Sequence, residues 1–355
     1  MMDGLEAAEL CYPQLLNSSC RRSPRPRTEA LLLYALLSSI TVLTIALNLL
    51  VVISISHFRQ LHTPTNLLLL SLAVSDLLVG LLVMPVEMVR VIESCWRLGE
   101  VMCALSYIIG FTLTSASVGN MVLISIDRYV AICHPLHYNN KITRSRIEVC
   151  VCLCWAFSLL YSGLILKDHL RQPDRHSSCY GECVVVINFV SGAVDLVITF
   201  IGPCSAIVLL YMRVFVVAVS QARALRSHIT AVAGVSVTIK AKRSERKAAR
   251  TLGVVILVFL ITFCPYYYPS LAGEDTSNSA SAWPIVSWLL FNSCLNPLIY
   301  AFFYPRDFMR PEVITSWTPR LGSSFKVSGH TRGVDLYATD RIFTDLALKN
   351  TQIGL

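Results

Sequence analysis

The sequence predicts an all-α membrane protein, a bundle of seven transmembrane helices. Only 15% of the 355 residues are charged and 54% are hydrophobic, whereas soluble domains carry about 25% charged residues. The apolar residues form continuous runs, each long enough for a helix to cross a hydrocarbon core about 30 Å thick. These runs lack the two-residue alternation of a membrane barrel, and helices satisfy their backbone groups internally. The runs cover about residues 30–56, 65–90, 101–133, 147–166, 185–217, 248–271 and 281–304.

The first run and the loop charges predict the domain organisation. The first run begins near Ala30 and is too long for the apolar part of a signal peptide, so we expect it to remain as the first helix. Between residues 218 and 246 the chain carries six basic residues and one acid, and basic loops favour the cytoplasm. Four arginines before the first helix oppose this orientation, but the whole-chain sum favours it. We therefore expect an extracellular segment 1–29, a membrane domain 30–305 and a cytoplasmic tail 306–355.

The net charge of +8 follows from this bias of the inner loops and does not indicate nucleic-acid binding. On the opposite, outer side the environment is oxidising, and six of the thirteen cysteines fall there. No outer histidine has the spacing of a zinc ligand relative to them, which disfavours a zinc site. Asn17 begins a glycosylation sequon on the same side. The six cysteines are Cys11, Cys20, Cys95, Cys103, Cys179 and Cys183.

Isolated polar residues lie deep within three of the runs. Asn48, Asp76 and Asn296 must face the bundle interior and find partners there, because polar groups are costly in hydrocarbon. Ser117 in the third run can join them. Together their oxygens favour a Na⁺ site at Asp76, Ser117 and Asn296. The alternative is a hydrogen-bond network between helices without an ion.

The third run ends in the motif Asp127-Arg128-Tyr129, at the predicted cytoplasmic side. Cys103 lies 25 residues earlier, which corresponds to about 37 Å of helix, one membrane thickness including its interfaces. Arg128 there needs a carboxylate, and the candidates are Asp127 and Glu245, which begins the sixth helix. A link between Arg128 and Glu245 would hold two helix ends together and could open. The alternative is an arginine that extends to the interface on its own.

Prolines interrupt four of the predicted helices. A proline inside a helix frees a carbonyl and produces a kink. One such kink can be static, but several beside buried polar groups favour a bundle that moves between states. The four prolines are Pro85, Pro203, Pro265 and Pro297.

These motifs in combination resemble those of the rhodopsin-like G-protein-coupled receptors over about residues 30–305. A finer resemblance, to the trace amine-associated receptors, rests on segments 57–66 (HFRQLHTPTN), 125–129 (SIDRY), 245–253 (ERKAARTLG) and 302–305 (FFYP). The rhodopsin-like motifs are Asn48, Leu72-Ala73-Val74-Ser75-Asp76, Cys103, Asp127-Arg128-Tyr129, Trp155, Pro203 with Tyr211, Pro265 and Asn296-Pro297-Leu298-Ile299-Tyr300.

The resemblance implies a receptor rather than an enzyme, with no cofactor apart from the Na⁺ ion. It implies a plasma-membrane protein of olfactory neuron cilia that senses small amines and, through a stimulatory G protein, raises cyclic AMP. It also implies two disulfides, Cys103–Cys183 and Cys20–Cys179, and leaves Cys11 and Cys95 unassigned. The residues that it implies for the switch and for G-protein coupling are Asp127, Arg128, Tyr129, Glu245, Tyr211, Asn296, Pro297 and Tyr300.

The chain departs from that family at the amine anchor. The usual aspartate of the third helix, seven residues after the outer cysteine, is Gly110 here. Asp195 in the fifth run, two turns before Pro203 and about 12 Å above it, can replace this anchor. The amine would then bind in an inverted orientation, with its apolar tail in the room left by Gly110. The alternative is that Asp195 bonds to a neighbouring hydroxyl, with Thr114 and Ser115 as candidates.

A second acid, Glu87, follows Pro85 near the outer end of the second run. Two separated acids would suit a diamine or polyamine, because each ammonium needs its own anion. The favoured alternative is an interfacial glutamate paired with Arg90. Aromatic residues can line the same pocket, because ammonium groups are attracted to ring faces. The aromatic candidates are Phe111, Phe263 and Tyr267, and Thr114 is a further candidate for the pocket lining.

The tail also departs from the family. Asp307 and Pro311 interrupt the expected amphipathic helix, no later cysteine can carry a lipid, and we expect much of 306–355 to be disordered. Two alternative functions stay open: a rhodopsin-like receptor for a non-amine ligand, favoured by Gly110, and a family member with impaired signalling. A retinal protein is disfavoured, because residues 281–304 contain no lysine.

Overall fold

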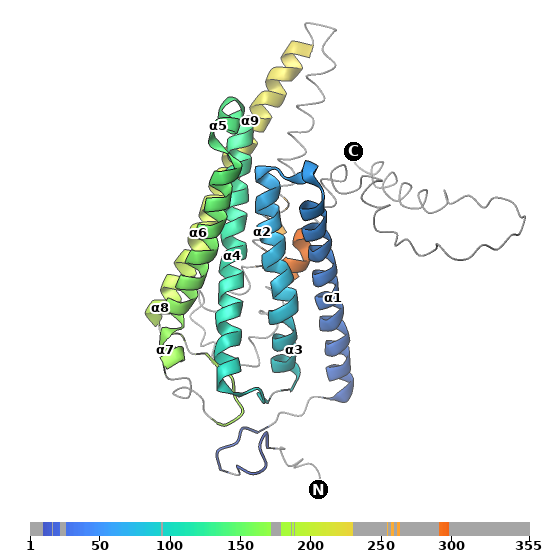
Figure 1. Cartoon of the computed structure of the whole chain (residues 1–355), viewed down its shortest axis with the longest axis vertical. Coiled ribbons are helices and arrows are strands. Elements are labelled where there is room, and N and C mark those ends of the chain that lie inside the picture. Colours follow the sequence, from blue (N-terminus) through green and yellow to red (C-terminus); the bar gives the residue numbers. More distant parts are fainter. Residues whose placement is uncertain are drawn as a thin grey trace, which may run out of the picture. The chain divides into compact units, whose positions relative to one another are not determined.

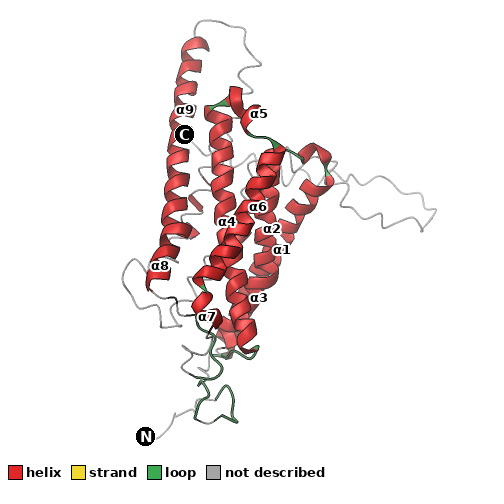
Figure 2. Cartoon of the chain, turned by 60° about the vertical axis from the view of Figure 1, so that its left-hand side comes forward, coloured by secondary structure: helices red, strands yellow, loops and turns green. Residues whose placement is uncertain are grey.

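Five helical spans of membrane-crossing length make up most of the part of the chain that the computed structural model describes. This part comprises residues 10–15, 17–21, 26–93, 95–171, 179–185, 187, 189–229, 254, 257–258, 261–262 and 291–297. The spans run side by side in Figures 1 and 2 and match the first five apolar runs. Most of the sixth and seventh runs lies outside the described residues. The five spans are Arg27–His57, Pro64–Arg90, Gly99–Cys133, Arg144–Ile165 and Phe189–Val217.

Local sequence explains where the helices begin and end. The second span begins at Pro64, which needs no N–H in the first helical turn, and the Thr63 hydroxyl accepts a hydrogen bond from the Asn66 N–H at 3.2 Å. Short helices lie in the connections between spans. The helices are α1 Arg27–His57, α2 Pro64–Leu78, α3 Met84–Glu93, α4 Gly99–Cys133, α5 Tyr138–Lys141, α6 Arg144–Ile165, α7 Lys167–Arg171, α8 Phe189–Asp195 and α9 Gly202–Ile229.

Two of the spans contain a widened, π-helical turn directly before a proline. Val79–Val83 joins α2 to α3 ahead of Pro85, and Leu196–Ile201 joins α8 to α9 ahead of Pro203. A proline ring crowds the carbonyl four residues earlier and supplies no N–H, and a π turn absorbs both effects. Gly202 permits the second turn, because a Cβ atom there would lie 3.0 Å from the Val197 carbonyl oxygen.

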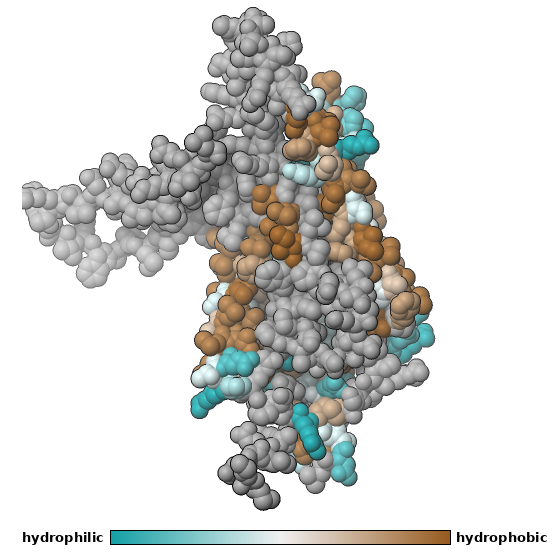
Figure 3. Space-filling view, turned by 180° about the vertical axis from the view of Figure 1, so that it is seen from behind, coloured by the Kyte–Doolittle hydropathy of each residue, from teal (hydrophilic) through white to brown (hydrophobic). Residues whose placement is uncertain are grey.

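The helices pack around α4, which contacts α2, α6 and α9. The main core lies between these helices and includes Leu68, Leu72, Val118 and Ile207. Apolar side chains also cover the outside of the spans, and Leu153, for example, is 63% exposed. On the face in Figure 3 the described residues are mostly hydrophobic along the helices and hydrophilic toward their ends. A surface of this kind fits a lipid environment.

Three disulfides lie at one end of the spans, where three segments meet. The segments are 10–21, 95–99 and 179–183, and we call this end the disulfide end. Short bridges pair Leu10 with Arg21 and Ser19 with Tyr180. The N-terminal segment 10–21 lies at the same end as α7 in Figure 1.

Candidate functional site

Asp195 lies at the end of α8, buried between two spans and only 7% exposed. Its Oδ1 accepts a hydrogen bond from the Tyr161 hydroxyl at 2.5 Å and from the Thr199 hydroxyl at 3.3 Å. Tyr161 comes from α6, whereas Thr199 belongs to the π turn that follows Asp195 and also donates to the Asp195 carbonyl at 2.6 Å. The carboxylate is therefore held between the fourth and fifth spans.

The second oxygen of this carboxylate, Oδ2, has no hydrogen-bond donor among the residues that the structure describes. Among the described residues, no donor bonds to Asp195 Oδ2 and no cationic side chain contacts Asp195. Buried carboxylates are stable only when they are hydrogen-bonded or paired with a cation. The geometry therefore combines an oriented Oδ1 with an Oδ2 that can accept a charged donor.

The partners of Asp195 differ from the two hydroxyls considered from sequence. Thr114 and Ser115 are half-buried on α4, and neither makes the hydrogen bonds that hold Asp195. Thr199 follows Asp195 by four residues on one helical face, so the sequence carries a signal for that contact. Tyr161 lies 34 residues away, and only the packing of α6 against the fifth span brings it there.

Gly110 on α4 is loosely surrounded by the described residues. Among the described residues, a Cβ atom at this position would have one heavy atom within 4 Å, Val83 Cγ1 of the second span at 4.0 Å. Phe111 beside it and Thr114 one turn further are half-buried. Two other predicted lining residues, Phe263 and Tyr267, lie outside the described residues. The described residues around Gly110 therefore leave room for an added side chain or part of a ligand.

Glu87 is paired with Arg90, which confirms the pairing that we favoured from the sequence over a second amine site. Arg90 Nη1 lies 2.6 Å from Glu87 Oε1, and the two side chains are 18% and 17% exposed. Arg90 Nη2 also donates to Ser106 Oγ at 2.8 Å. Glu87 and Asp195 thus differ in their partners, a guanidinium for one and neutral hydroxyls for the other.

A buried polar cluster surrounds Asp76. Asn296 Nδ2 donates to Asp76 Oδ2 at 2.9 Å, and Ser117 Oγ lies 3.4 Å from Asp76 Oδ1 and 3.0 Å from Ser75 Oγ. Asn48 joins the seventh span to the first through the Ser293 carbonyl, at 3.0 Å. Among the described residues, Asn296 Oδ1 and Asn48 Oδ1 are buried without a hydrogen-bond donor. A carboxylate beside hydroxyl and unpaired amide oxygens fits a small cation such as Na⁺.

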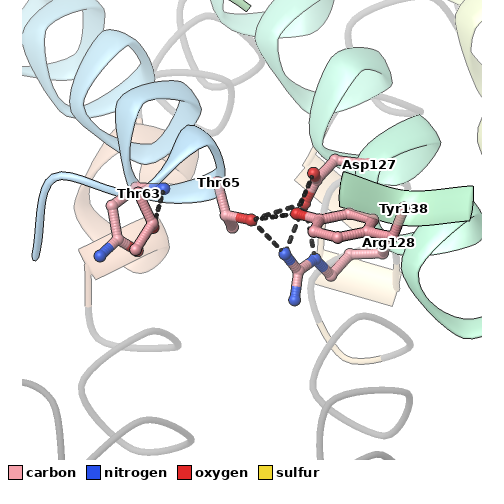
Figure 4. Close-up of polar contacts among 6 residues, drawn as sticks. Thr63, Thr65, Asp127, Arg128 and Tyr138 are labelled. Atoms are coloured by element: carbon pink, nitrogen blue, oxygen red, sulfur yellow. Dashed lines mark hydrogen bonds and ion pairs between the residues drawn. The ribbon is translucent and has the colours of Figure 1, made fainter. Parts of the chain in front are cut away.

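Arg128 lies near the end of α4 opposite to the disulfide of Cys103, and Figure 4 shows its contacts with Asp127 and Thr65. Its Nε and Nη2 donate to Asp127 Oδ2 at 3.0 and 2.5 Å, and Nη2 also donates to Thr65 Oγ1 at 2.5 Å. The Tyr138 hydroxyl donates to Asp127 Oδ1 at 2.9 Å. Burial raises the pKa of Tyr138, so the phenol keeps the proton that it donates. Glu245 lies outside the described residues.

The other predicted switch residues occupy packed positions. Tyr129 contacts the His134 ring edge to face at 5.6 Å between centroids, and Tyr211 packs against the main core. Asn296 and Pro297 lie in the described helical segment 291–297. Tyr300 falls outside the described residues.

The disulfide end contains both disulfides implied by the resemblance, Cys103–Cys183 and Cys20–Cys179. A third, Cys11–Cys95, ties the N-terminal segment to the loop after α3. Glu182 lies close to Cys20 and Cys179, but both sulfurs are in the disulfide and cannot ligate a metal. Six outer cysteines with two pairs assigned leave one pair, which is the sequence signal for the third disulfide. Asn17 is exposed in the segment between Cys11 and Cys20.

Comparisons with known proteins agree with this arrangement. Residues 47–300 match the family model of the 7 transmembrane receptor (rhodopsin family). The chain is 36% identical over 308 residues to trace amine-associated receptor 13c of Danio rerio, covering 84% of this chain and 90% of that protein. It is 39% identical over 311 residues to human trace amine-associated receptor 6 (85% and 90%) and 38% identical over 309 residues to mouse trace amine-associated receptor 1 (83% and 92%). The chain therefore belongs to the rhodopsin family of seven-transmembrane receptors, among the trace amine-associated receptors.

Proposed function

We propose that this receptor senses a small amine and that Asp195 binds the ammonium group. The observation that carries the proposal is the carboxylate itself, buried between two spans, with Oδ1 held by Tyr161 and Thr199 and Oδ2 without a donor among the described residues. A buried carboxylate forms its strongest interactions with a charged donor. The names of the relatives, trace amine-associated receptors, agree with an amine ligand.

The open space at Gly110 supports an inverted orientation of the ligand. With its ammonium at Asp195 on the fifth span, the apolar tail would extend toward α4, where a Cβ atom at Gly110 would meet, among the described residues, Val83 alone at 4.0 Å. Phe111 and Thr114 lie on the same helix beside that space. The ligand would therefore be bound by its charge at one end and by apolar contacts at the other.

Ligand binding would act on the receptor by shifting an equilibrium between two arrangements of the helices. In the resting arrangement Arg128 is bonded to Asp127 and Thr65, and a Na⁺ ion at Asp76, Ser117 and Asn296 would stabilise the same state. The π turns before Pro85 and Pro203 are places where the spans can bend. Release of Arg128 would open the cytoplasmic side to a G protein.

We further propose a stimulatory G protein, a rise in cyclic AMP and a plasma-membrane location in olfactory neurons, with the N-terminus outside and Asn17 glycosylated. The three disulfides agree with an extracellular location of the disulfide end. A labelling experiment with a membrane-impermeant reagent on an N-terminal tag tests this orientation.

The test of the ligand site is cyclic AMP production in cells that express the wild type or Asp195→Asn, across a panel of amines. Losing one partner of a buried charge pair costs about 3–5 kcal/mol, or more than about a hundredfold in potency. Asp168→Asn is the matched control, because it is the same change at an exposed position of α7. Equal potency in Asp195→Asn and the wild type, at equal surface levels, would contradict the proposal.

A receptor for a neutral ligand is the second candidate, and Gly110 is the observation that favours it, because the usual amine anchor is missing. The same assay separates the two functions when each amine is compared with the alcohol of equal length. An alcohol that matches its amine in potency would favour the neutral ligand.

A further inference from the structure

We infer that this receptor is selective for ligands with one ammonium group, because Arg90 occupies the second cation site that a diamine would need. The inference rests on the proposed function, since it takes Asp195 as the site of the first ammonium. It concerns the region of α3 and α4 where Glu87 and Arg90 lie.

The Arg90 guanidinium is fixed by contacts on several sides. Nη1 donates to Glu87 Oε1 at 2.6 Å, and Nη2 donates to Ser106 Oγ at 2.8 Å and to Cys183 Sγ at 3.5 Å. Cys183 forms a disulfide with Cys103, and Cys103 is a residue of α4. A side chain held from α3, α4 and the loop cannot leave this position without breaking contacts on all three.

Two aromatic rings complete the surroundings of this cation. The guanidinium carbon lies 4.4 Å from the centroid of the Tyr107 ring and 5.4 Å from the centroid of the Trp96 ring. A carboxylate combined with aromatic ring faces is also the environment that binds alkylammonium ions. The region therefore has the composition of an amine site, and the protein's own guanidinium fills it.

This filled site lies next to the open space at Gly110. Val83, the closest neighbour of a Cβ atom at Gly110, precedes Glu87 by four residues on the same helical face. Tyr107 precedes Gly110 by three residues on α4 and is therefore its neighbour on that helix. The Glu87–Arg90 pair lies about one turn from the space, toward the disulfide end. A ligand that extends from Asp195 toward α4 would bring a second ammonium close to Arg90.

The charges of the two sites then decide the ligand class. Asp195 contacts no cation among the described residues, so it attracts one ammonium. Glu87 is already neutralised by Arg90, so a second ammonium would meet a pair without net charge and a guanidinium of its own sign. An apolar tail meets no such repulsion, and we expect a monoamine to bind better than the diamine of the same length.

The experiment compares n-alkyl monoamines with α,ω-diamines of equal chain length in the cyclic AMP assay, with surface level measured for every variant. We expect the wild type to favour the monoamine, and Arg90→Met to shift the potency ratio toward the diamine by about tenfold or more, because it frees Glu87. Arg90→Lys keeps the charge and should keep the ratio. The double variant Arg90→Met/Glu87→Gln should lose the gain. Arg97→Met is the matched control, because it removes the same charge at an exposed position of the loop.

The results separate this inference from the proposed function. A wild type that responds to amines and favours diamines would overturn the inference, even if the Arg90 variants fail to reach the surface. An unchanged ratio in Arg90→Met and in Arg90→Gln at normal surface level would also overturn it. In both cases amine sensing through Asp195 stands. A wild type that no amine activates, while neutral ligands do, would instead contradict the proposed function.

Discussion

Asp195 and Glu87 are two carboxylates in the half of the spans near the disulfide end, and their surroundings differ in charge. Asp195 accepts hydrogen bonds from two neutral hydroxyls, Tyr161 and Thr199, and comes from the fifth span. Glu87 accepts from the Arg90 guanidinium, which is held in turn by Ser106. The difference teaches where a cationic ligand can find an unbalanced charge: Glu87 already has its counter-ion in Arg90, whereas Asp195 has none among the described residues.

The largest expected difference between the two regions appears when the charges of each are removed in turn. Asp195→Asn should reduce monoamine potency by more than about a hundredfold, because a buried ammonium would lose its counter-charge. Removing both charges of the other pair, in Arg90→Met/Glu87→Gln, should change monoamine potency by less than about threefold, since a neutral pair is replaced by neutral side chains. Concentration–response curves for cyclic AMP measure both. Similar losses in the two variants would remove the distinction between the sites.

Moving the acid back to the third helix should restore part of the lost response. The described surroundings of Gly110 accept a side chain, because a Cβ atom there would meet, in the part of the chain that the structure describes, Val83 alone at 4.0 Å. In the Asp195→Asn background, Gly110→Asp should recover about tenfold or more of the monoamine potency, with the ligand turned around. Gly110→Asn in the same background is the control for shape. Recovery with asparagine as well would show that charge is not what the site provides.

Removing the hydroxyl that orients Asp195 should have a smaller effect than removing the acid. Tyr161→Phe deletes the 2.5 Å hydrogen bond to Oδ1, and bonds to charged groups contribute about 1.5–3 kcal/mol, so we expect a potency loss of about ten- to a hundredfold. Thr199→Val should cost less, because the Thr199 bond to Oδ1 is longer, at 3.3 Å. In the Asp195→Asn background, Tyr161→Phe should add little. An undiminished loss there would make Tyr161 a ligand contact in its own right.

The fold and the two carboxylates were predictable from the sequence to different degrees. Runs of apolar residues predicted the five described spans to within a few residues, because crossing a membrane requires a continuous apolar stretch. The pair Glu87–Arg90 was also foreseeable, since residues three apart are neighbours on a helix. Tyr161 could not be found this way, because its contact with Asp195 depends on how two spans pack. The widened turns before Pro85 and Pro203 were expected only as kinks.

The third disulfide, Cys11–Cys95, allows the most sensitive test of the comparison, because it supports the surroundings of Arg90 and not those of Asp195. Cys11–Cys95 lies directly before Trp96, whose backbone N–H donates to the Gly181 carbonyl at 2.8 Å and whose carbonyl accepts from the Tyr12 hydroxyl at 3.2 Å. Trp96 in turn forms one side of the surroundings of Arg90. Breaking the disulfide should therefore loosen the hold on Arg90 and leave Asp195 unaffected.

We expect the double variant Cys11→Ser/Cys95→Ser to raise diamine potency by about two- to threefold. A weakened cation–π contact at a partly exposed site changes the binding free energy by an amount that corresponds to such a factor. Monoamine potency should stay the same, because Tyr161 and Thr199 hold Asp195 without this segment. Concentration–response curves at matched surface levels measure both potencies. Equal changes for the two ligand classes would mean that the disulfide acts on the whole receptor. A change in the diamine response alone would assign Trp96, and through it the N-terminal segment, to the control of Arg90.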